Sequence, residues 1–492
     1  MRKVLATILA LVMALGLTTA AWADTGVDCA GGEGCTHQAA IGSTHYNTLA
    51  EAITAAQAGE TIVLQDNATT AALQNDITYD LNGHTLTYSG STHVVGVDKT
   101  LTFMDSSVTG NARGGTLELS GVTGTRAAIN PQRGATLKVS NIKVTCTGSA
   151  FFPQGDAAKV DVTACDVTAP IYCVGTNAGS TNNYNVVITL KDSTFVASAD
   201  DGDNCAVMIN VPGTLNIDNC TITGDRQAVL VRAGTAVITN SDIKTTGKFN
   251  EASTKYHSGA WKDGNEVPAA ALTVGNYQNK AATAYLADAK VTVTNTKLTA
   301  ENGVPAIYTD ANNTYKGDLT IGGDSTVVKG NVMKGQKADE HVSVIAVTGG
   351  TFSSDVSDFV DSAPVASIGR TNERTYYVGA GTIQNVANSL SAGQELVIRK
   401  GTVRLTDVPA GVIVRPEHDT VVFVNGKDIS NEFDGYTVPQ SSGYYYYQPT
   451  TDTKANDTKG SPKTFDAGIA LYVGMALTSA AGVAFVGKKR ED

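Results

Sequence analysis

Basic residues are scarce in this chain of 492 residues. Lys and Arg number 36 against 47 Asp and Glu, so the net charge is −11. Subtracting the +2 of the first three residues and the +1 of the residues after Ser461 leaves −14 for residues 24–461. This balance excludes the basic surface with which proteins bind nucleic acid.

Proline is scarce as well, with 12 residues against 50 glycines. Abundant Gly, Thr, Asn, Ser and Val favour many short strands that are joined by turns. The length is sufficient for a large core and for more than one domain. Composition therefore favours a β-rich protein.

Long apolar runs occur only at the two ends of the chain. At the N-terminus, two basic residues precede the apolar stretch Val4–Leu17, and the small-x-small cleavage pattern AWA follows. This arrangement predicts a signal peptide over residues 1–23 and a mature chain that begins at Asp24.

At the C-terminus, residues 467–486 contain no charge, and Lys488, Lys489 and Arg490 follow them. Such a run, at about 1.5 Å per residue, spans roughly the 30 Å of a bilayer core. Basic residues favour the cytoplasmic side, so the rest of the chain should face outward. We expect a transmembrane helix over 467–486 and an extracellular ectodomain.

Seven cysteines are an odd number, so at least one of them has no partner within the chain. Cys29 and Cys35 lie close together in a Cys- and Gly-rich leader, residues 24–45. They either form a local disulfide, which export permits, or remain free thiols. No cofactor and no metal site is predicted.

A short pattern recurs along the middle of the chain, with two apolar residues in alternation, then polar and small residues, then a further apolar residue. The copies are VSNIKV at 139, VTACDV at 162, LKDSTF at 190, IDNCTI at 217, ITNSDI at 238, VTNTKL at 293 and VTGGTF at 347. The first five copies are separated by 23, 28, 27 and 21 residues. A period in this range indicates a solenoid, a propeller or an array.

Each repeat is predicted to contain two or three short strands. Alternation with period 2 indicates strands, and no helical pattern lies between the copies. A second apolar run follows each copy, as in AFFP at 150, IYCV at 171 and AVLV at 228. Short strands stacked about 4.8 Å apart predict a parallel β-helix, whereas a propeller blade needs roughly 40 or more residues. We therefore expect an all-β fold, with a parallel β-helix over residues 46–362.

Cysteine positions constrain this alignment of the repeats. Cys165 and Cys220 share one column of the alignment, and the coil of Ser193 lies between them. Two steps between coils put them roughly 9–10 Å apart, beyond the reach of a disulfide. We interpret both as small stacking residues. The other members of the column are Ile142, Ser193, Ser241 and Thr296, and the cysteines whose pairing stays open are Cys146, Cys173 and Cys205.

The open end of a β-helix exposes unpaired strand edges and needs a cover. TLAEAITAAQAGETIVL predicts one, with a capping box at Thr48 and an amphipathic helix that Gly59 ends. A similar stretch, TIQNVANSLSAGQELVI, begins at Thr382 and has Gly393 in the place of Gly59. It predicts the start of a second, smaller β-rich module over residues 363–448. The polar residues 449–463 lack aromatic residues and are expected to form a disordered tether.

Together these stretches resemble the pectate-lyase-like right-handed β-helix proteins that Gram-positive bacteria display. The resemblance covers residues 46–359 and is carried by YNTLAEAITAAQAGETIVL at 46, DLNGHTLTY at 80 and VTGGTFSSDVSDF at 347. It implies a right-handed β-helix at the cell surface. Proteins of this fold include adhesins, polysaccharide lyases and glycoside hydrolases, so the fold alone assigns no activity.

The tail, residues 464–492, resembles a sortase sorting signal, which consists of a pentapeptide, an apolar span and a basic tip. The resemblance implies that a sortase thiolate attacks the carbonyl of Thr464 and passes the chain to a peptidoglycan amine. The pentapeptide has Ser461 where the common form has Leu, and Phe465 where Gly normally stands. Without processing, the apolar span still anchors the chain. The pentapeptide residues are Ser461, Pro462, Lys463, Thr464 and Phe465.

One turn column holds the candidates for catalysis. A lyase needs carboxylates that hold Ca²⁺ and a basic residue, and a hydrolase needs paired carboxylates. An acidic pair beside an Arg can perform such acid–base chemistry, but Asp is also a turn residue that any β-helix requires. The signatures Gly-His-Gly and Arg-x-Lys are absent, so we interpret the column as solvated turns with a hydrated Arg226. The candidates are Asp201, Asp203, Asp225, Arg226 and Glu301.

The segment Gly247–Pro268 interrupts the repeat and carries His257 and Trp261, which is one of two Trp in the chain. Binding surfaces tend to lie on long loops of a rigid scaffold. The segment is either a binding loop, in which His257 and Trp261 contact the ligand, or a disordered insertion.

These observations favour a surface-anchored protein with a binding, adhesion or structural role at the bacterial envelope. The alternative is a surface polysaccharide lyase or glycoside hydrolase. The expected partners are a sortase and peptidoglycan, if the tail is processed, and a glycan or other host-surface ligand.

Overall fold

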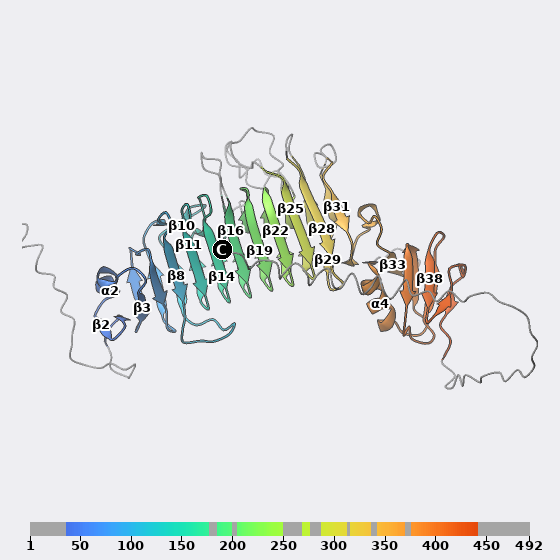
Figure 1. Cartoon of the computed structure of the whole chain (residues 1–492), viewed down its shortest axis with the longest axis horizontal. Helices are drawn as coiled ribbons and strands as arrows, with labels where there is room; N and C mark the ends of the chain where they lie inside the picture. Colours follow the sequence, from blue (N-terminus) through green and yellow to red (C-terminus); the bar gives the residue numbers. More distant parts are fainter. Residues whose placement is uncertain are drawn as a thin grey trace, which may run out of the picture. The chain divides into compact units, whose positions relative to one another are not determined.

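The structure is a computed structural model that describes residues 36–176, 185–198, 204–248, 268–275, 287–311, 315–335, 342–369 and 375–440. Strands dominate these ranges, and the two α-helices are short (Figure 1). The predicted all-β class is confirmed. No helix in these ranges is long and apolar enough to cross a membrane, and the predicted span 467–486 lies outside them.

Three long sheets, here named A, B and C, account for most strands. The chain passes from a strand of sheet A to one of sheet B, then in most coils to one of sheet C, and back to sheet A. The strands of sheet A are β1 (Ala39–Ile41), β2 (Thr44–Tyr46), β3 (Thr61–Leu64), β5 (Ile77–Asp80), β8 (Thr100–Met104), β11 (Thr136–Ser140), β14 (Lys159–Thr163), β16 (Val186–Lys191), β19 (Gly213–Asp218), β22 (Gly234–Thr239), β25 (Ala289–Thr294), β28 (Gly317–Gly322) and β31 (Ile345–Val347).

Sheet B follows the same stacking order and then continues beyond it. Its first strands are β4 (Ala68–Thr70), β6 (Thr85–Tyr88), β9 (Thr116–Leu119), β12 (Lys143–Cys146), β15 (Asp166–Ala169), β17 (Thr194–Ala197), β20 (Thr221–Gly224), β23 (Asp242–Thr245), β26 (Lys297–Ala300), β29 (Val327–Lys329) and β32 (Gly350–Phe352). It continues through β34 (Tyr376–Val378), β33 (Val365–Ile368), β35 (Glu395–Lys400), β37 (Ile413–Pro416) and β40 (Tyr436–Thr437).

Sheet C has a three-stranded and a five-stranded part, which isolated bridges at Val174 connect. The first part contains β7 (His93–Val95), β10 (Ala127–Pro131) and β13 (Ser149–Phe151). The second contains β18 (Cys205–Ile209), β21 (Gln227–Val231), β24 (Ala270–Val274), β27 (Ile307–Thr309) and β30 (Val332–Lys334). A small sheet D contains β36 (Thr402–Leu405), β38 (Val421–Val424) and β39 (Lys427–Asp428).

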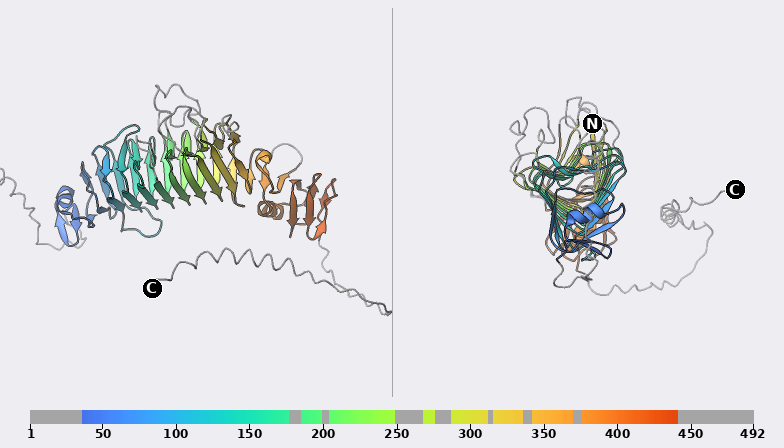
Figure 2. Two further views of the ribbon diagram at one scale, coloured as in Figure 1. Left: turned by 45° about the horizontal axis from the view of Figure 1, so that its top comes forward. Right: turned by 90° about the vertical axis from the view of Figure 1, so that its left-hand side faces the viewer.

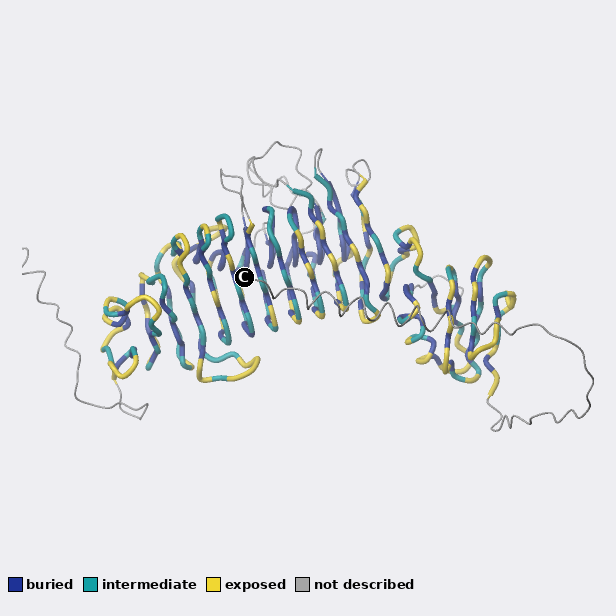
Figure 3. The backbone as a smooth tube through the Cα atoms, viewed as in Figure 1, coloured by how far each residue is buried: buried dark blue, intermediate teal, exposed yellow. Residues whose placement is uncertain are grey.

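Successive coils stack in parallel (Figure 2). Because they stack in register, buried apolar residues form ladders on the inner faces of the sheets. Strands of sheets A and B alternate between buried and partly exposed residues (Figure 3). This is the arrangement of a parallel β-helix, and it follows from period-2 patterning that repeats once per coil. One internal ladder of sheet A contains Leu101, Leu137, Val160, Ile188, Leu215, Ala236, Val291, Leu319 and Ile345.

The predicted column of small residues lies at the corner between sheets A and B. Its members are buried, and each follows a sheet A strand by two residues. Cys165 and Cys220 are free thiols in separate coils, as the alignment predicted. The residue before each member is left-handed, with φ between 50° and 59°, a conformation that Asn and Asp tolerate best. These left-handed residues are Asn141, Ala164, Asp192, Asn219, Asn240 and Asn295.

The N-terminal end of the stack carries the predicted cover. Helix α2 (Leu49–Ala55) starts with a capping box, in which the Thr48 hydroxyl accepts a hydrogen bond from the Glu51 N–H at 3.2 Å. Leu49 and Ala52 are buried against the core. The hairpin β1–β2 precedes the helix and extends sheet A in antiparallel order.

The C-terminal part repeats this construction around a second hydrophobic cluster. The order β33, β34, α4 (Ala380–Ser389), β35 matches β1, β2, α2, β3, and parallel pairs β35–β37 and β36–β38 match β3–β5 and β4–β6. Gly59 and Gly393 have φ of 89° and 85° in equivalent turns. The repeat joins sheet B through β34, which pairs antiparallel with β32. Between them lies the short 3₁₀ helix η1 (Ser357–Phe359).

Candidate functional site

The predicted turn column exists at the end of three successive sheet B strands. The register of β20, β23 and β26 places Asp225, Thr246 and Glu301 at equivalent positions in consecutive coils. Thr246 therefore lies between the two acidic residues, which are two coils apart. Asp201 and Asp203 lie outside the described residues.

Asp225 and Glu301 contact different side chains. The Thr246 hydroxyl donates to one oxygen of Asp225 at 2.9 Å, and the Lys248 ammonium lies 3.8 Å from the other. Glu301 forms an ion pair of 2.7 Å with Lys244. Among the described residues the two carboxylates share no partner, and each forms an ion pair with a different lysine.

Arg226 differs from the sequence-based expectation. It is only 1% exposed and Asp225 only 8%, so the prediction of a solvated turn with a hydrated Arg226 is wrong. The following coil holds the main chain of Arg226, because the Arg226 carbonyl accepts from the Thr245 hydroxyl at 2.7 Å and from the Ala270 N–H at 3.2 Å. The turn is buried between neighbouring coils.

Asn204, which sequence patterns did not single out, organises this turn. Its side-chain oxygen accepts hydrogen bonds from the N–H groups of Asp225 at 2.8 Å and Arg226 at 3.3 Å. Its side-chain nitrogen donates to the carbonyl of Pro170 at 2.8 Å. One amide therefore connects three coils, and this role explains why the residue is 1% exposed. The signal in the sequence is an Asn directly before the apolar run CAVMI.

The outer face of sheet C is buried in its middle strands β18, β21 and β24, unlike the outer faces of sheets A and B. Every residue of β18, β21 and β24 is buried. Outward side chains such as Met208 and Leu230 belong to a hydrophobic cluster separate from the core. The remaining members of that cluster are Ala127, Phe152, Ile171, Tyr172 and Cys205. The absence of polar alternation in runs such as AVLV reflects burial on both faces.

Polar side chains border this buried face where the sheet C strands end. The Thr176 hydroxyl donates to the side-chain oxygen of Asn210 at 2.9 Å, and both residues are fully buried. The Tyr308 hydroxyl donates to Asp310 at 3.1 Å. Burial and the nearby Asp310 charge raise the pKa of Tyr308 above its ordinary value. These pairs satisfy buried polar groups, as low-dielectric interiors require.

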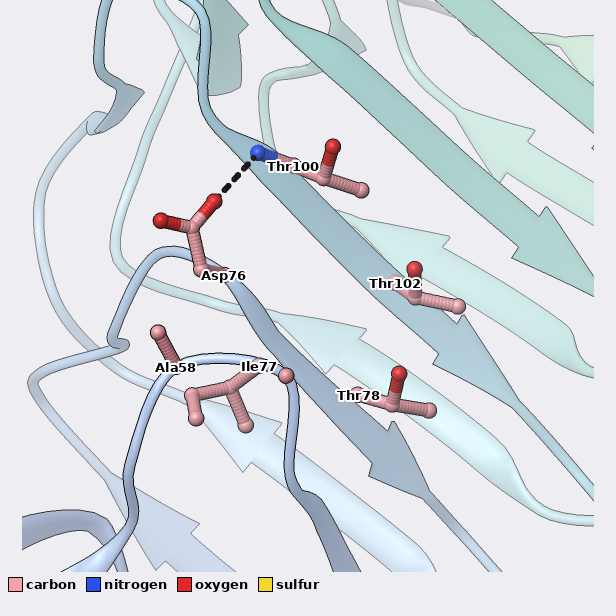
Figure 4. A pocket seen from close by; sticks show the side chains of 7 residues that line it. Ala58, Asp76, Ile77, Thr78, Thr100 and Thr102 are labelled. Carbon is pink, nitrogen blue, oxygen red and sulfur yellow. Dashed lines mark hydrogen bonds between the residues drawn. The ribbon is translucent and has the colours of Figure 1, made fainter.

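A hollow of about 380 Å³ lies on the outer face of sheet A near its N-terminal end. Strands β5 and β8 form its floor, and the turn after α2 forms one wall (Figure 4). The floor carries Thr78, Thr100 and Thr102, whose hydroxyl oxygens are turned the same way in Figure 4. The other lining residues are Ala58, Gly59, Asp76 and Ile77.

Asp76 is the charged residue of the hollow. Its carboxylate accepts a hydrogen bond of 2.9 Å from the Thr100 N–H and one of 2.7 Å from the Lys99 ammonium. The bond with Lys99 is the main cause that holds the pKa of Asp76 below its ordinary value. The carboxylate is therefore ionised at neutral pH.

The remaining predicted site residues lie outside the described ranges. They are His257 and Trp261 of the insertion, the sorting pentapeptide Ser461–Phe465, and the leader cysteines Cys29 and Cys35. Within the described ranges, no group of three or more His, Cys, Asp or Glu side chains is arranged to hold a metal ion. Comparisons with protein-family models, curated proteins and solved structures found no match for this chain.

Proposed function

We propose that this chain is a cell-surface β-helix protein with a binding or adhesive role at a bacterial envelope. The signal peptide pattern, the apolar tail and its basic tip support an exported and anchored chain. The chain's ligand is a glycan or another host-surface molecule. A right-handed β-helix is the scaffold that carries the binding surface. Sortase attaches the chain to peptidoglycan through Thr464 if it accepts the pentapeptide SPKTF.

The observation that carries a binding role is the separation of Asp225 from Glu301. A lyase or hydrolase needs carboxylates that act on one substrate atom or hold one cation. Here each of the two carboxylates is paired with its own lysine, and Thr246 lies in the coil between them. The buried turn is tied to Asn204 and holds coils together, a structural task.

Two measurements test this proposal. Fractionation of cells with and without muramidase separates a wall-linked chain from one that remains in the membrane. Release of the protein into the medium with its tail intact would contradict both forms of anchoring. Incubation of the full-length protein with polygalacturonate and Ca²⁺ should give no unsaturated product. Activity that Arg226→Ala abolishes would make the chain an enzyme.

A further inference from the structure

The cap that borders the hollow on sheet A is repeated in the second module. Comparing the two copies shows which residues this cap needs in order to form. Gly59 donates its N–H to the carbonyl of Asp76 at 2.6 Å, and Gly393 donates to Gly411 at 2.8 Å. Gly411 thus occupies the place of Asp76. Strand pairing gives a second equivalence. Thr78 pairs with Thr61 in the first copy, and Ile413 pairs with Glu395 in the second, so Ile413 occupies the place of Thr78.

At the two equivalent places the second module has a tightly packed glycine and an apolar residue. A Cβ added at Gly411 would lie 2.6 Å from the Cβ of Ala392, so no side chain fits there. The first copy has an ionised carboxylate and a threonine at the two equivalent places. The helix–turn–strand cap forms in both copies, and its folding therefore does not require an acidic residue and a threonine at these two places. Asp76 and Thr78 are specific to the first copy.

The floor of the hollow offers hydrogen-bonding groups to a ligand. Within the described part of the chain, the hydroxyls of Thr78, Thr100 and Thr102 form no hydrogen bond to protein. Each hydroxyl can donate once and accept twice. Both oxygens of Asp76 have one protein donor and retain further capacity to accept. Ala58, at an exposed position, supplies apolar surface beside these groups.

This combination matches the chemistry of a sugar ring, which has several hydroxyls around an apolar ring face. The volume of 380 Å³ falls in the range of about 300–1,000 Å³ that small-molecule sites occupy. The charge of −14 over residues 24–461 and the carboxylate of Asp76 both disfavour an acidic sugar.

We propose that the hollow binds one unit of a neutral saccharide, with Asp76 and the three threonines as its hydrogen-bonding partners. The inference rests on the proposed binding function and locates its ligand site. Sugar hydroxyls donate to Asp76 and exchange hydrogen bonds with the threonine hydroxyls. The ring lies against Ala58 at the wall of the hollow.

Four variants test the site without removing the fold. Thr78→Val and Thr102→Val keep the side-chain shape and delete one hydroxyl each. Asp76→Asn removes the charge, and Asn tolerates the φ of 60° at this position. Ala58→Trp fills the hollow from an exposed position of its wall.

Thr320→Val is the matched control. Register places Thr102 and Thr320 on the same outer ladder of sheet A, far apart along the stack. Thr320 is exposed and outside the hollow. Thr320→Val, like Thr102→Val, removes one hydroxyl from the outer face of sheet A, but at a distance from the hollow.

The experiment uses the full-length protein purified in detergent. A printed array of neutral and sialylated oligosaccharides identifies bound glycans, and calorimetry with the best neutral oligosaccharide gives the affinity. We expect Asp76→Asn and Ala58→Trp to weaken binding about tenfold or more, and each Val variant about two- to tenfold. Thr320→Val should bind as the parent does. Thermal unfolding of each variant confirms that it is folded.

The possible outcomes distinguish failure of the hollow as the binding site from failure of the proposed binding function. If the parent binds neutral glycans and the hollow variants bind them equally well, the site is refuted and the binding function stands. If the parent binds no glycan on the array, the glycan-binding function and the site both fail. A preference for sialylated over neutral glycans would refute the ligand class.

Discussion

The hydroxyl oxygen of Ser193 accepts a hydrogen bond of 3.0 Å from the backbone N–H of Cys165, one coil earlier in the stack. The same hydroxyl donates to the carbonyl of Lys191 at 2.6 Å. Ser241 holds the N–H of Cys220 in the same way, also at 3.0 Å. Each such side chain satisfies buried backbone groups at a corner where the strands of sheets A and B are interrupted.

Ser193→Ala should therefore destabilise the protein. The buried N–H of Cys165 loses its acceptor, which costs about 1–3 kcal/mol in the free energy of unfolding. Ser193→Thr should be close to neutral, because Thr296 has the same role in a later coil, where it accepts from the Ser241 N–H at 3.3 Å. Urea titration measures both. Ser391→Ala, at an exposed position, is the control and should change stability by less than about 0.5 kcal/mol. Equal stability of Ser193→Ala and the parent would contradict this role.

Arg113 fastens the loop after β8 across three coils. Its guanidinium pairs with Asp166 at 3.1 Å and donates to the carbonyls of Asp192 at 2.7 Å and Cys165 at 3.4 Å. Lysine has no planar fork and cannot make these contacts together. We expect Arg113→Lys to lower the free energy of unfolding by about 1–3 kcal/mol.

The exposed Arg126 provides the matched control for this substitution. Arg126→Lys should leave the urea midpoint unchanged, since surface substitutions usually alter stability by less than about 0.5 kcal/mol. A similar small effect of both substitutions would show that the Arg113 contacts contribute little.

His93 makes stability dependent on pH. Burial lowers its pKa from 6.5 to about 4, and its ring nitrogen contacts the Asn75 side chain at 3.0 Å. The unfolded chain binds a proton near pH 6.5 but the folded chain does not, so stability is full above pH 6.5 and is lost as the pH falls toward 4. The loss at pH 4 is roughly 2–3 kcal/mol.

The substitution His93→Gln isolates this contribution. Melting temperatures of parent and variant should run parallel above pH 6.5 and converge or cross between pH 6.5 and 4, because only the parent gains a protonation penalty. Parallel curves over the whole range would show that His93 titrates normally in the folded state.

Buried thiols should resist alkylation in the folded protein. Burial raises the pKa of Cys165 and Cys173 to about 12 and that of Cys146 to about 11. Because the thiolate is the reactive form, iodoacetamide at pH 8 should modify Cys165 and Cys173 only after unfolding. Cys146 is half-buried and should react first among the three. Peptide mass spectrometry measures the order, and rapid labelling of Cys165 would contradict the packing.

Repetition made much of the fold predictable from the sequence. Strands of sheets A and B bury one face only, so residues such as Leu137 and Val139 alternate with exposed ones in the pattern that defines a strand. The corner column was predictable because a position occupied mostly by Ser, Cys or Thr recurs at the same place in successive repeats. Helix α2 carried a capping box that local rules recognise, and a left-handed glycine marks the turn after each helix.

Long-range contacts were beyond these patterns. Nothing near Arg226 in the sequence indicates that Asn204, in the preceding coil, accepts its N–H and helps to bury the turn. The run AVLV predicts a strand whether one face or both are covered, so the buried outer face of β21 was not foreseen. The antiparallel pairing of Tyr377 with Thr351 likewise has no local mark.

The left-handed residues before the corner column have a consequence for folding fidelity. A neighbouring coil that slipped by one residue would place a β-branched residue such as Ile142 or Thr296 in the left-handed position of Asn141 or Asn295. That conformation costs an ordinary L-residue roughly 1–2 kcal/mol, and a slip of every coil would incur it repeatedly. The asparagines thus fix the register between neighbouring coils, because a slip of one residue raises the free energy at the corner where it occurs.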